Sequence, residues 1–154
     1  MNIFVLSYST RLAAKYHCDQ HMKMCLEYAQ ILCTVAHLRG VKAKYRPTHQ
    51  YGRIVAWANT SAANAAWLRD LLTDLGAENI KRFGKTHKSV AVGLDAFEKV
   101  YPHLPEVGMT KFALAMPDKY KHRNTVKAYR AFYKGDKTWA RWNHSAKPYW
   151  IAND

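Results

Sequence analysis

The chain has 154 residues, enough for one domain with its own hydrophobic core, and 49% of them are apolar. Lys and Arg number 24 against 11 Asp and Glu, so the formal net charge is +13, an excess that favours a polyanionic partner. No apolar run approaches the ~18 residues of a membrane-spanning helix, and the first residues lack the features of a signal peptide, so we expect neither a membrane protein nor a secreted one.

The cysteines of the chain bear on its redox environment. Cys18, Cys25 and Cys33 lie within one predicted helical region. An odd number of closely spaced cysteines is typical of reduced thiols rather than of a disulfide framework. We therefore expect a cytoplasmic location.

The first elements are predicted from the apolar pattern and from helix caps. Residues 2–7 are apolar on both faces, which indicates a short, buried, extended segment. Ser9 or Thr10 is suited to cap a short helix that follows over residues 11–17.

A stripe of polar residues runs along the next predicted helix, which is capped by Asp19, extends to Leu38 and stops at Gly40. Spacings of three and four residues place the stripe on one face: Gln20, Lys23, Glu27, Gln30, Thr34 and His37. The stripe is either a solvated face or the floor of a cleft. In a cleft, the Glu27 carboxylate, one turn after Lys23, would exchange protons near neutral pH.

Polar side chains near the start of this helix are candidate metal ligands. The spacing around His17, Asp19 and His21 matches no zinc pattern, because neither Cys-x-x-Cys nor His-Glu-x-x-His is present. We predict no metal and no cofactor. A metal-dependent nuclease that uses His17, Asp19 and His21 stays open as an alternative.

The middle of the chain combines a basic loop with a helix. Residues 39–53 form the loop, in which Pro47 excludes a regular helix. A helical stretch follows over residues 54–75, with a candidate break near 59–61 and an end at Gly76.

The last third contains shorter elements. Residues 78–101 are predicted to hold two short helices separated near Gly84, and the prolines within 102–118 indicate an irregular crossing. The last helix is expected to begin at Asn124 and to run to about Trp142.

Sequence patterns typical of β-strands are almost absent after the first few residues. The chain shows neither an internal repeat nor a second region of distinct amino-acid composition. We therefore predict a mainly α fold. It is a single compact helical domain over residues 1–154, with a short extended N-terminal segment.

Two basic stretches predict contact with a nucleic acid. The loop carries phosphate donors, and residues 119–147 contain nine basic residues against one acid, Asp136, interleaved with aromatic rings that can stack on bases. Tyr149 and Trp150 lie beyond the last predicted helix, so we expect burial in the core less for them than for Trp139. The predicted contacts are Arg46, His49, Arg53, Lys121, Arg123, Lys127, Arg130, Lys134 and Trp150.

Three stretches make the chain similar to a known family. They are Cys-Asp-Gln-His-Met-Lys-Met-Cys-Leu-Glu at 18–27, Arg-Pro-Thr-His-Gln-Tyr-Gly-Arg at 46–53, and the aromatic, basic tail from 129 to 150. The pattern resembles the phage pyrimidine-dimer DNA glycosylases with AP-lyase activity, of the endonuclease V type. This resemblance implies a small, basic, mainly helical enzyme that acts on double-stranded DNA as a monomer, without a cofactor, in a phage-infected or bacterial host cell.

The resemblance also implies a mechanism. In this family an N-terminal α-amine displaces the base at C1′ and forms an imine with the opened sugar, a glutamate assists, and the duplex is held with a nucleotide flipped out. The matching carboxylate is Glu27. Asn2 is bulky enough for Met1 to be retained, so the nucleophile is the Met1 amine, or Lys23, or is lacking. The catalytic candidates are Glu27, Met1, Lys23 and His21.

Two further alternatives remain at this point. A phage enzyme that modifies a DNA base would need the same basic cleft, acid or base group and flipped nucleotide as one that removes it. A non-catalytic protein that binds DNA or RNA would need only the basic surface, with the polar stripe solvated.

Overall fold

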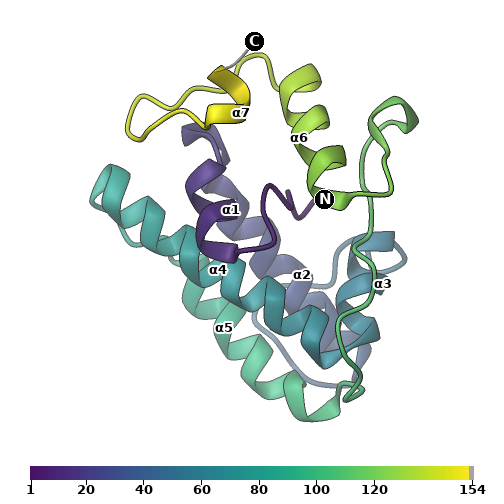
Figure 1. Ribbon diagram of the computed structural model, residues 1–154. Helices are drawn as coiled ribbons and strands as arrows, with labels where there is room; N and C mark the ends of the chain where they lie inside the picture. Colours follow the sequence, from purple (N-terminus) through teal and green to yellow (C-terminus); the bar gives the residue numbers. More distant parts are fainter. Residues whose placement is uncertain (153–154) are drawn as a thin grey trace.

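The computed structural model describes residues 1–152, which are 60% helical and contain no β-strand. They form one compact domain, so the predicted mainly α class is confirmed (Figure 1). The α-helices are α1 (Thr10–Tyr16), α2 (Met24–Leu38), α3 (Arg53–Thr60), α4 (Ala62–Phe83), α5 (Ser89–Val100), α6 (Thr125–Asp136) and α7 (Tyr149–Ala152). The 3-10 helices are η1 (Asp19–Lys23), η2 (Tyr101–His103) and η3 (Asp118–Tyr120).

Helix α2 is the centre of the fold. It packs against α3, α4 and α5, and α1 packs against α4 on the outside of this group. Ten of its fifteen residues are buried. This burial explains why the sequence of α2 is apolar on most of its sides.

The N-terminal segment is buried, as predicted, but it is bent rather than extended throughout, because Phe4 has a φ of 29° and the N–H of Leu6 donates to the carbonyl oxygen of Phe4 (2.7 Å). Ile3, Phe4, Val5 and Leu6 are almost fully shielded from solvent. The short helix after it also agrees with the prediction, because the Ser9 hydroxyl accepts a hydrogen bond from the backbone N–H of Leu12 (3.3 Å) and caps α1.

The prediction of one continuous helix from Asp19 to Leu38 is wrong in its first turn. Residues Asp19–Lys23 form the 3-10 helix η1, and the α-helix begins at Met24. The Asp19 carboxylate does not cap a helix, because it accepts hydrogen bonds from the backbone N–H of Asn143 (2.9 Å) and from Arg82 (3.3 Å). The competing tertiary partners therefore override the local capping signal.

Helix α4 differs from its prediction at one end only. The chain breaks at Ser61, as expected, and the Ser61 hydroxyl caps α4. The predicted end at Gly76 is wrong, because α4 continues to Phe83 and ends before Gly84, whose φ of 66° suits a helix terminus. Gly76 is buried where α4 meets Val90, so its lack of a side chain permits close packing.

The last helix is shorter than predicted. Asn124 caps α6 by accepting from the N–H of Lys127 (3.0 Å), as expected, but α6 ends at Asp136 rather than near Trp142. The chain then folds back, because the Trp142 indole N–H donates to the carbonyl oxygen of Tyr16 (3.0 Å). A helix continued to Trp142 would lose this contact. The short helix α7 that follows was not predicted.

Candidate nucleic-acid interface

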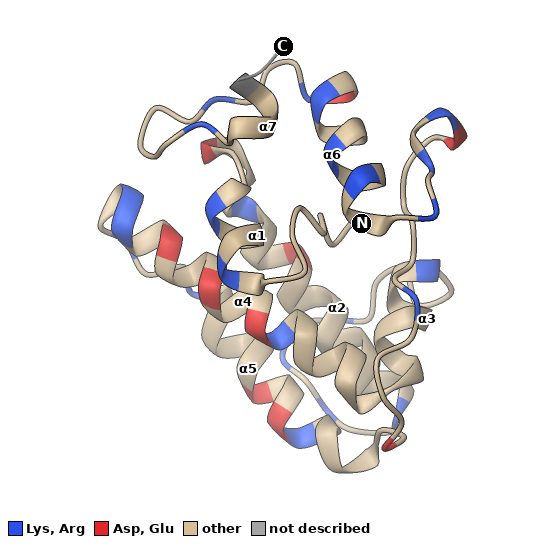
Figure 2. Cartoon of the chain, in the orientation of Figure 1, with Lys and Arg blue, Asp and Glu red and all other residues tan. Residues whose placement is uncertain are grey.

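Charge is unevenly divided between the two sides of the molecule. Five of the acidic residues lie on α4 and α5, whereas α6 has one acid, Asp136. Figure 2 shows Lys and Arg bands along α6 and red segments on α4 and α5. Arg123, Lys127 and Lys134 are exposed, and the last two are seven residues apart, so they share one helix face. We call these three residues the α6 row.

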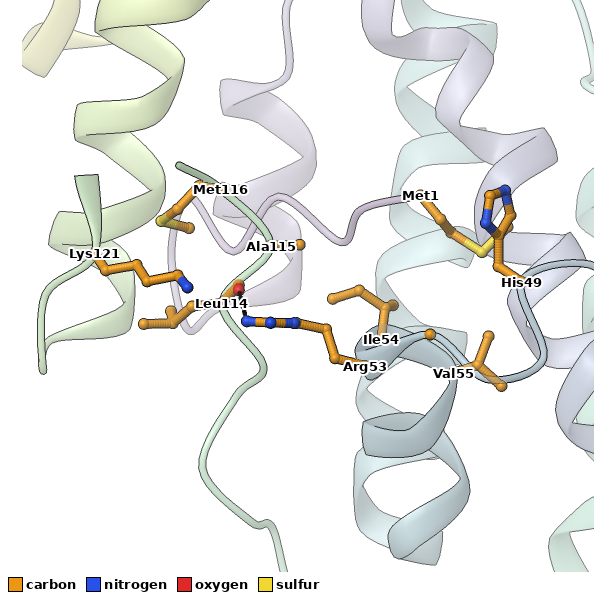
Figure 3. Close-up of a pocket in the computed structure, with 10 residues that line it drawn as sticks. Met1, His49, Arg53, Ile54, Val55, Leu114, Ala115, Met116 and Lys121 are labelled. Atoms are coloured by element: carbon orange, nitrogen blue, oxygen red, sulfur yellow. Dashed lines mark hydrogen bonds between the residues drawn. The ribbon is translucent and has the colours of Figure 1, made fainter. Parts of the chain in front are cut away.

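A cavity of about 360 Å³ lies near the N-terminal end of this row. Four of its lining residues are site candidates from three separate parts of the chain: Met1, His49 and Arg53, and Lys121. The remaining wall is mostly apolar, with Ile54, Val55, Leu114, Ala115 and Met116 (Figure 3). We call this cavity the N-terminal pocket. Its volume is within the range of small-molecule sites, and its charged groups stand against apolar walls, as in such sites.

Short hydrogen bonds hold the walls of the N-terminal pocket together. Arg53, the first residue of α3, donates from Nη1 to the carbonyl oxygen of Leu114 (3.1 Å), drawn as a dashed line in Figure 3. The Asn2 amide donates to the carbonyl oxygen of Ala115 (2.8 Å). Lys121 forms an ion pair with Asp118 (2.8 Å). Residues 114–116 of the irregular segment thus form one wall of the pocket.

The loop that carries His49 is docked on α2. The Thr34 hydroxyl accepts from the N–H of Thr48 (3.0 Å) and donates to the carbonyl oxygen of Gln30 (2.8 Å), and His37 donates to the carbonyl oxygen of Tyr45 (3.0 Å). His49 adopts a φ of 48° next to this anchor. A strained backbone at an exposed, docked residue is frequent at binding sites.

The polar stripe runs over η1 and α2, and it is hydrogen-bonded to other segments at both ends but not in the middle. At one end the Gln20 amide donates to the carbonyl oxygen of Trp139 and accepts from the N–H of Arg141, and at the other end Thr34 meets the loop. Between them Lys23 is exposed, and Glu27 is half-buried with no hydrogen bond or ion pair within the described residues. The stripe is therefore neither a plain solvated face nor part of the N-terminal pocket, which Glu27 and Lys23 do not line.

His21 occupies a closed aromatic environment. Its ring stacks on Phe4 with centroids 4.5 Å apart, and its Nδ1 lies 2.7 Å from the Tyr133 hydroxyl. Burial, together with the positive charges of His17, Lys137 and Lys23, lowers the pKa of His21 to about 2. A ring that stays neutral and shielded at pH 7 has a packing role here, and it does not line the N-terminal pocket.

The residues of the metal-nuclease alternative do not converge on a metal position. His17 donates from Nδ1 to the carbonyl oxygen of Ala13 (2.7 Å), so its Nε2 accepts from the Tyr28 hydroxyl (2.7 Å). Asp19 is bonded to other groups, as described above. Over residues 1–152, no group of three His, Cys, Asp or Glu side chains is placed to hold a metal ion.

Two of the predicted nucleic-acid contacts are engaged inside the protein. Arg130 donates from Nε to the carbonyl oxygen of Leu6 (2.9 Å) and lies over the rings of Tyr16 and Trp150. Trp150 is only 9% exposed, whereas Trp139 is 43% exposed. The sequence predicted the opposite, with Trp139 the more buried of the two. Trp150 is a core residue, because its ring packs on Tyr16 and Tyr133. Its predicted role as a ring for base stacking is wrong.

Sequence reasoning missed the apolar wall of the N-terminal pocket. Leu114, Ala115 and Met116 belong to a segment that the prolines marked only as irregular. The signal that could have found them is the apolar run Ala-Leu-Ala-Met at 113–116, which is unusual for a segment without regular structure. Arg46, also predicted as a contact, is exposed on the loop but does not line the pocket.

No helix within residues 1–152 is both long enough and apolar enough to cross a membrane. Comparison of the chain with protein-family models, with curated proteins and with solved structures finds no match in any of the three.

Proposed function

We propose that this protein is a DNA-acting enzyme, a glycosylase and AP lyase of phage type that removes damaged or modified pyrimidines from a duplex by base flipping. One observation carries the proposal. Four candidates from three distant parts of the chain, Met1, the loop residues His49 and Arg53, and Lys121, line one pocket beside the α6 row. In this proposal the row holds the phosphate backbone and the pocket receives the flipped nucleotide.

The composition of the pocket suits a nucleotide. Apolar walls accept the face of a base, and Arg53 and Lys121 supply donors for the adjoining phosphates. Two amines line the pocket, and Lys121 is paired with Asp118, whereas Met1 has no hydrogen bond or ion pair within the described residues. We therefore assign the nucleophile to the amine of Met1 rather than to Lys121 or Lys23.

The proposed chemistry proceeds by covalent catalysis. The amine nitrogen bonds to C1′ of the deoxyribose as the C1′–N bond to the base breaks, and the base leaves with the electron pair and gains a proton. Opening of the sugar gives a protonated imine, and loss of a C2′ proton then expels the 3′ phosphate. In this proposal His49, which lines the pocket, is the general acid or base for the leaving base or the sugar.

Borohydride trapping on a duplex with one abasic site tests this assignment. Reduction fixes an imine as a stable amine, and mass mapping of the digested adduct identifies the modified residue. We expect the adduct on the peptide that contains Met1, and we expect Lys121→Arg, which keeps the charge but cannot form the imine, to retain it. An adduct on Lys23 or on Lys121, or no adduct under conditions of full binding, contradicts the assignment.

Glu27 provides a second test, because the resemblance implies a catalytic carboxylate and the structure leaves it unpartnered in the middle of the stripe. If Glu27 is that carboxylate, Glu27→Gln, which keeps the shape but cannot exchange a proton, should lower turnover of a damaged duplex by ~10²-fold or more while DNA binding persists. Because the carboxylate is half-buried and unpaired, stability should change by less than ~0.5 kcal/mol. Full turnover in this variant excludes Glu27 as the acid or base.

One observation favours a second candidate function. Glu27 does not line the N-terminal pocket. A non-catalytic DNA-binding protein would have the same basic row and pocket without an aligned acid or base. This function is established instead if duplex DNA binds in a salt-dependent way and neither trapping nor strand cleavage is observed.

A further inference from the structure

The side chain of Asn2 joins the N-terminus to a wall of the N-terminal pocket. Its Nδ2 donates to the carbonyl oxygen of Ala115 (2.8 Å), a residue 113 positions further along the chain that lines this pocket. Its Oδ1 accepts from the backbone N–H of Ile3 (2.9 Å) and, at a longer distance, from that of Phe4 (3.4 Å). One amide group therefore bonds to the start of the chain and to a distant segment at the same time.

The wall of the pocket is itself fixed by other side chains. The Tyr129 hydroxyl, on α6, donates to the carbonyl oxygen of Ala113 (2.7 Å) and accepts from the N–H of Ala115 (3.3 Å). Tyr129 is fully buried, and Arg53 of α3 holds the intervening carbonyl oxygen, as described above. This wall has no regular secondary structure, so side chains satisfy its backbone groups instead. Asn2 is thus bonded to a support that two helices hold.

The residues after Asn2 are anchored as well. Residues 3–6 are buried in the core, and Arg130 donates from Nε to the carbonyl oxygen of Leu6 (2.9 Å). Chain ends are usually poorly ordered unless such contacts hold them. The Met1 side chain is half-buried against the core, whereas its α-amine has no hydrogen bond or ion pair within the described residues. Asn2 is therefore the last hydrogen-bonded residue before the amine.

The amine of Met1 is close to this fixed point along the chain. The peptide bond that joins Met1 to Asn2 is planar, so only two single bonds turn the amine relative to the Cα of Asn2. Holding Asn2 therefore confines the amine to a small region. A confined nucleophile reacts faster than a mobile one, and a displacement of about 1 Å can cost about 10²-fold in rate.

We propose that Asn2 is the positioning residue for the Met1 amine. Its amide group holds the start of the chain on the wall at Ala115 and so keeps the amine at the N-terminal pocket. The inference rests on the proposed function for the atom that the amine attacks, which is C1′ of the sugar. The attachment of the chain end is a property of the protein alone, so the test has one arm with DNA and one arm without it.

Asn2→Leu is the test variant, because Leu has a similar size but neither donates nor accepts a hydrogen bond. Its side chain is also bulky enough for Met1 to be retained, which mass spectrometry confirms. Asn79→Leu is the matched control. The Asn79 amide donates to the carbonyl oxygen of Lys85 over the same distance, 2.8 Å, and Asn79 does not line the pocket. Urea unfolding compares the stabilities of the two variants, since each loses one amide-to-carbonyl contact.

The first arm measures borohydride trapping on a duplex with one abasic site. At saturating duplex, we expect Asn2→Leu to trap about 10²-fold more slowly with unchanged affinity for the duplex, and Asn79→Leu to match the wild type. Free glycolaldehyde also forms an imine with the Met1 amine but is not held in place by the protein. Its trapping rate should therefore be equal in all three proteins. A purely structural role of Asn2 would instead weaken DNA binding together with trapping.

The second arm uses no DNA. The order parameter of the residue-2 backbone amide, from NMR relaxation, should be about 0.8 in the wild type and in Asn79→Leu and should fall below about 0.6 in Asn2→Leu. A mobile residue 2 in the wild type, or an order parameter or trapping rate that Asn2→Leu leaves unchanged, overturns the inference. If the order parameters behave as expected and the wild type forms no adduct at Met1, the assigned nucleophile fails while the positioning of the N-terminus by Asn2 stands.

Discussion

Two buried histidines, His17 and His21, lie beneath the N-terminal segment and are held by tyrosine hydroxyls. The Tyr133 hydroxyl lies 2.7 Å from His21 and also accepts from the N–H of Cys18 (2.9 Å). Phe4 covers this cluster from a backbone with φ of 29°, a conformation that costs an L-residue about 1–2 kcal/mol. Its ring contacts with His21 and Tyr133 offset that cost.

These histidines predict how stability depends on pH. Burial lowers the pKa of His17 to about 4 and that of His21 to about 2, against 6.5 for an exposed ring. Below about pH 6.5 the unfolded chain takes up protons that the folded protein excludes. Above this pH the two histidines should therefore not lower the free energy of unfolding. Below it, each histidine should lower the free energy of unfolding by about 1.4 kcal/mol per pH unit, until the pH reaches the pKa of that histidine in the folded protein.

Urea unfolding between pH 7 and pH 4.5 measures this dependence. His21→Asn retains a polar atom near the Nδ1 position but does not titrate, so its stability should fall less steeply with decreasing pH than that of the wild type. His103→Asn changes an exposed histidine and should leave the slope unaltered. Parallel slopes for the wild type and His21→Asn would show that His21 does not stay neutral in the folded protein.

At the scale of elements, the close packing of α2 on α5 organises the fold. Gly93 on α5 lies against Ala29 on α2, and a Cβ at position 93 would lie 3.0 Å from the Cα of Ala29 and would overlap Leu72 of α4. The absence of a side chain at this point lets three helices approach one another. This contact holds α2 in place, and α2 in turn carries the polar stripe and the docked loop of the N-terminal pocket.

Gly93→Ala should therefore destabilise the protein. Ala is favoured over Gly within a helix by up to about 1 kcal/mol, but the overlap with a neighbouring backbone should dominate and give a net loss of about 1–3 kcal/mol. The control is Gly108→Ala, where a Cβ would have no neighbour within 4 Å. Thermal or urea unfolding of Gly93→Ala measures this loss of stability. If the variant is as stable as the wild type or more stable, α5 moves aside without an energetic cost.

At the scale of the whole molecule, the net charge of +13 is concentrated by the fold. The acids of α4 and α5 form local ion pairs such as Lys99–Asp95 (2.9 Å) and Arg82–Glu78 (3.0 Å), which neutralise basic residues there. Helix α6 carries one acid, Asp136, against Lys127, Arg130 and Lys134. This surface is where a polyanion gains most.

Binding of duplex DNA should accordingly be steeply dependent on salt. Several phosphate contacts would release counterions, so we expect the affinity to fall by ~10²-fold or more between low and physiological salt. Fluorescence anisotropy over a salt series measures the slope, and Lys127→Ala in the middle of the α6 row should reduce it by about 1. An affinity that is indifferent to salt would remove the electrostatic basis of the interface.

The sequence alone determines the class of the fold and many helix starts, because these depend on short-range physics. Apolar spacing predicts helices, and Ser9, Ser61 and Asn124 cap or interrupt them through hydrogen bonds that span three residues. The residue types of the candidate site, amines and phosphate donors among aromatic rings, are also visible in the sequence. Their charge is a property of composition and needs no structure to be seen.

The tertiary structure alone decided where helices end and which candidates meet. Asp19 bonds to Asn143 rather than to its own helix, α6 stops where Trp142 returns to Tyr16, and Trp150 is buried by rings far away in the chain. The same long-range packing brings Met1 and Lys121 to one pocket and leaves Glu27 outside it. Burial and proximity arise from contacts between residues more than a hundred positions apart, and no local pattern encodes these contacts.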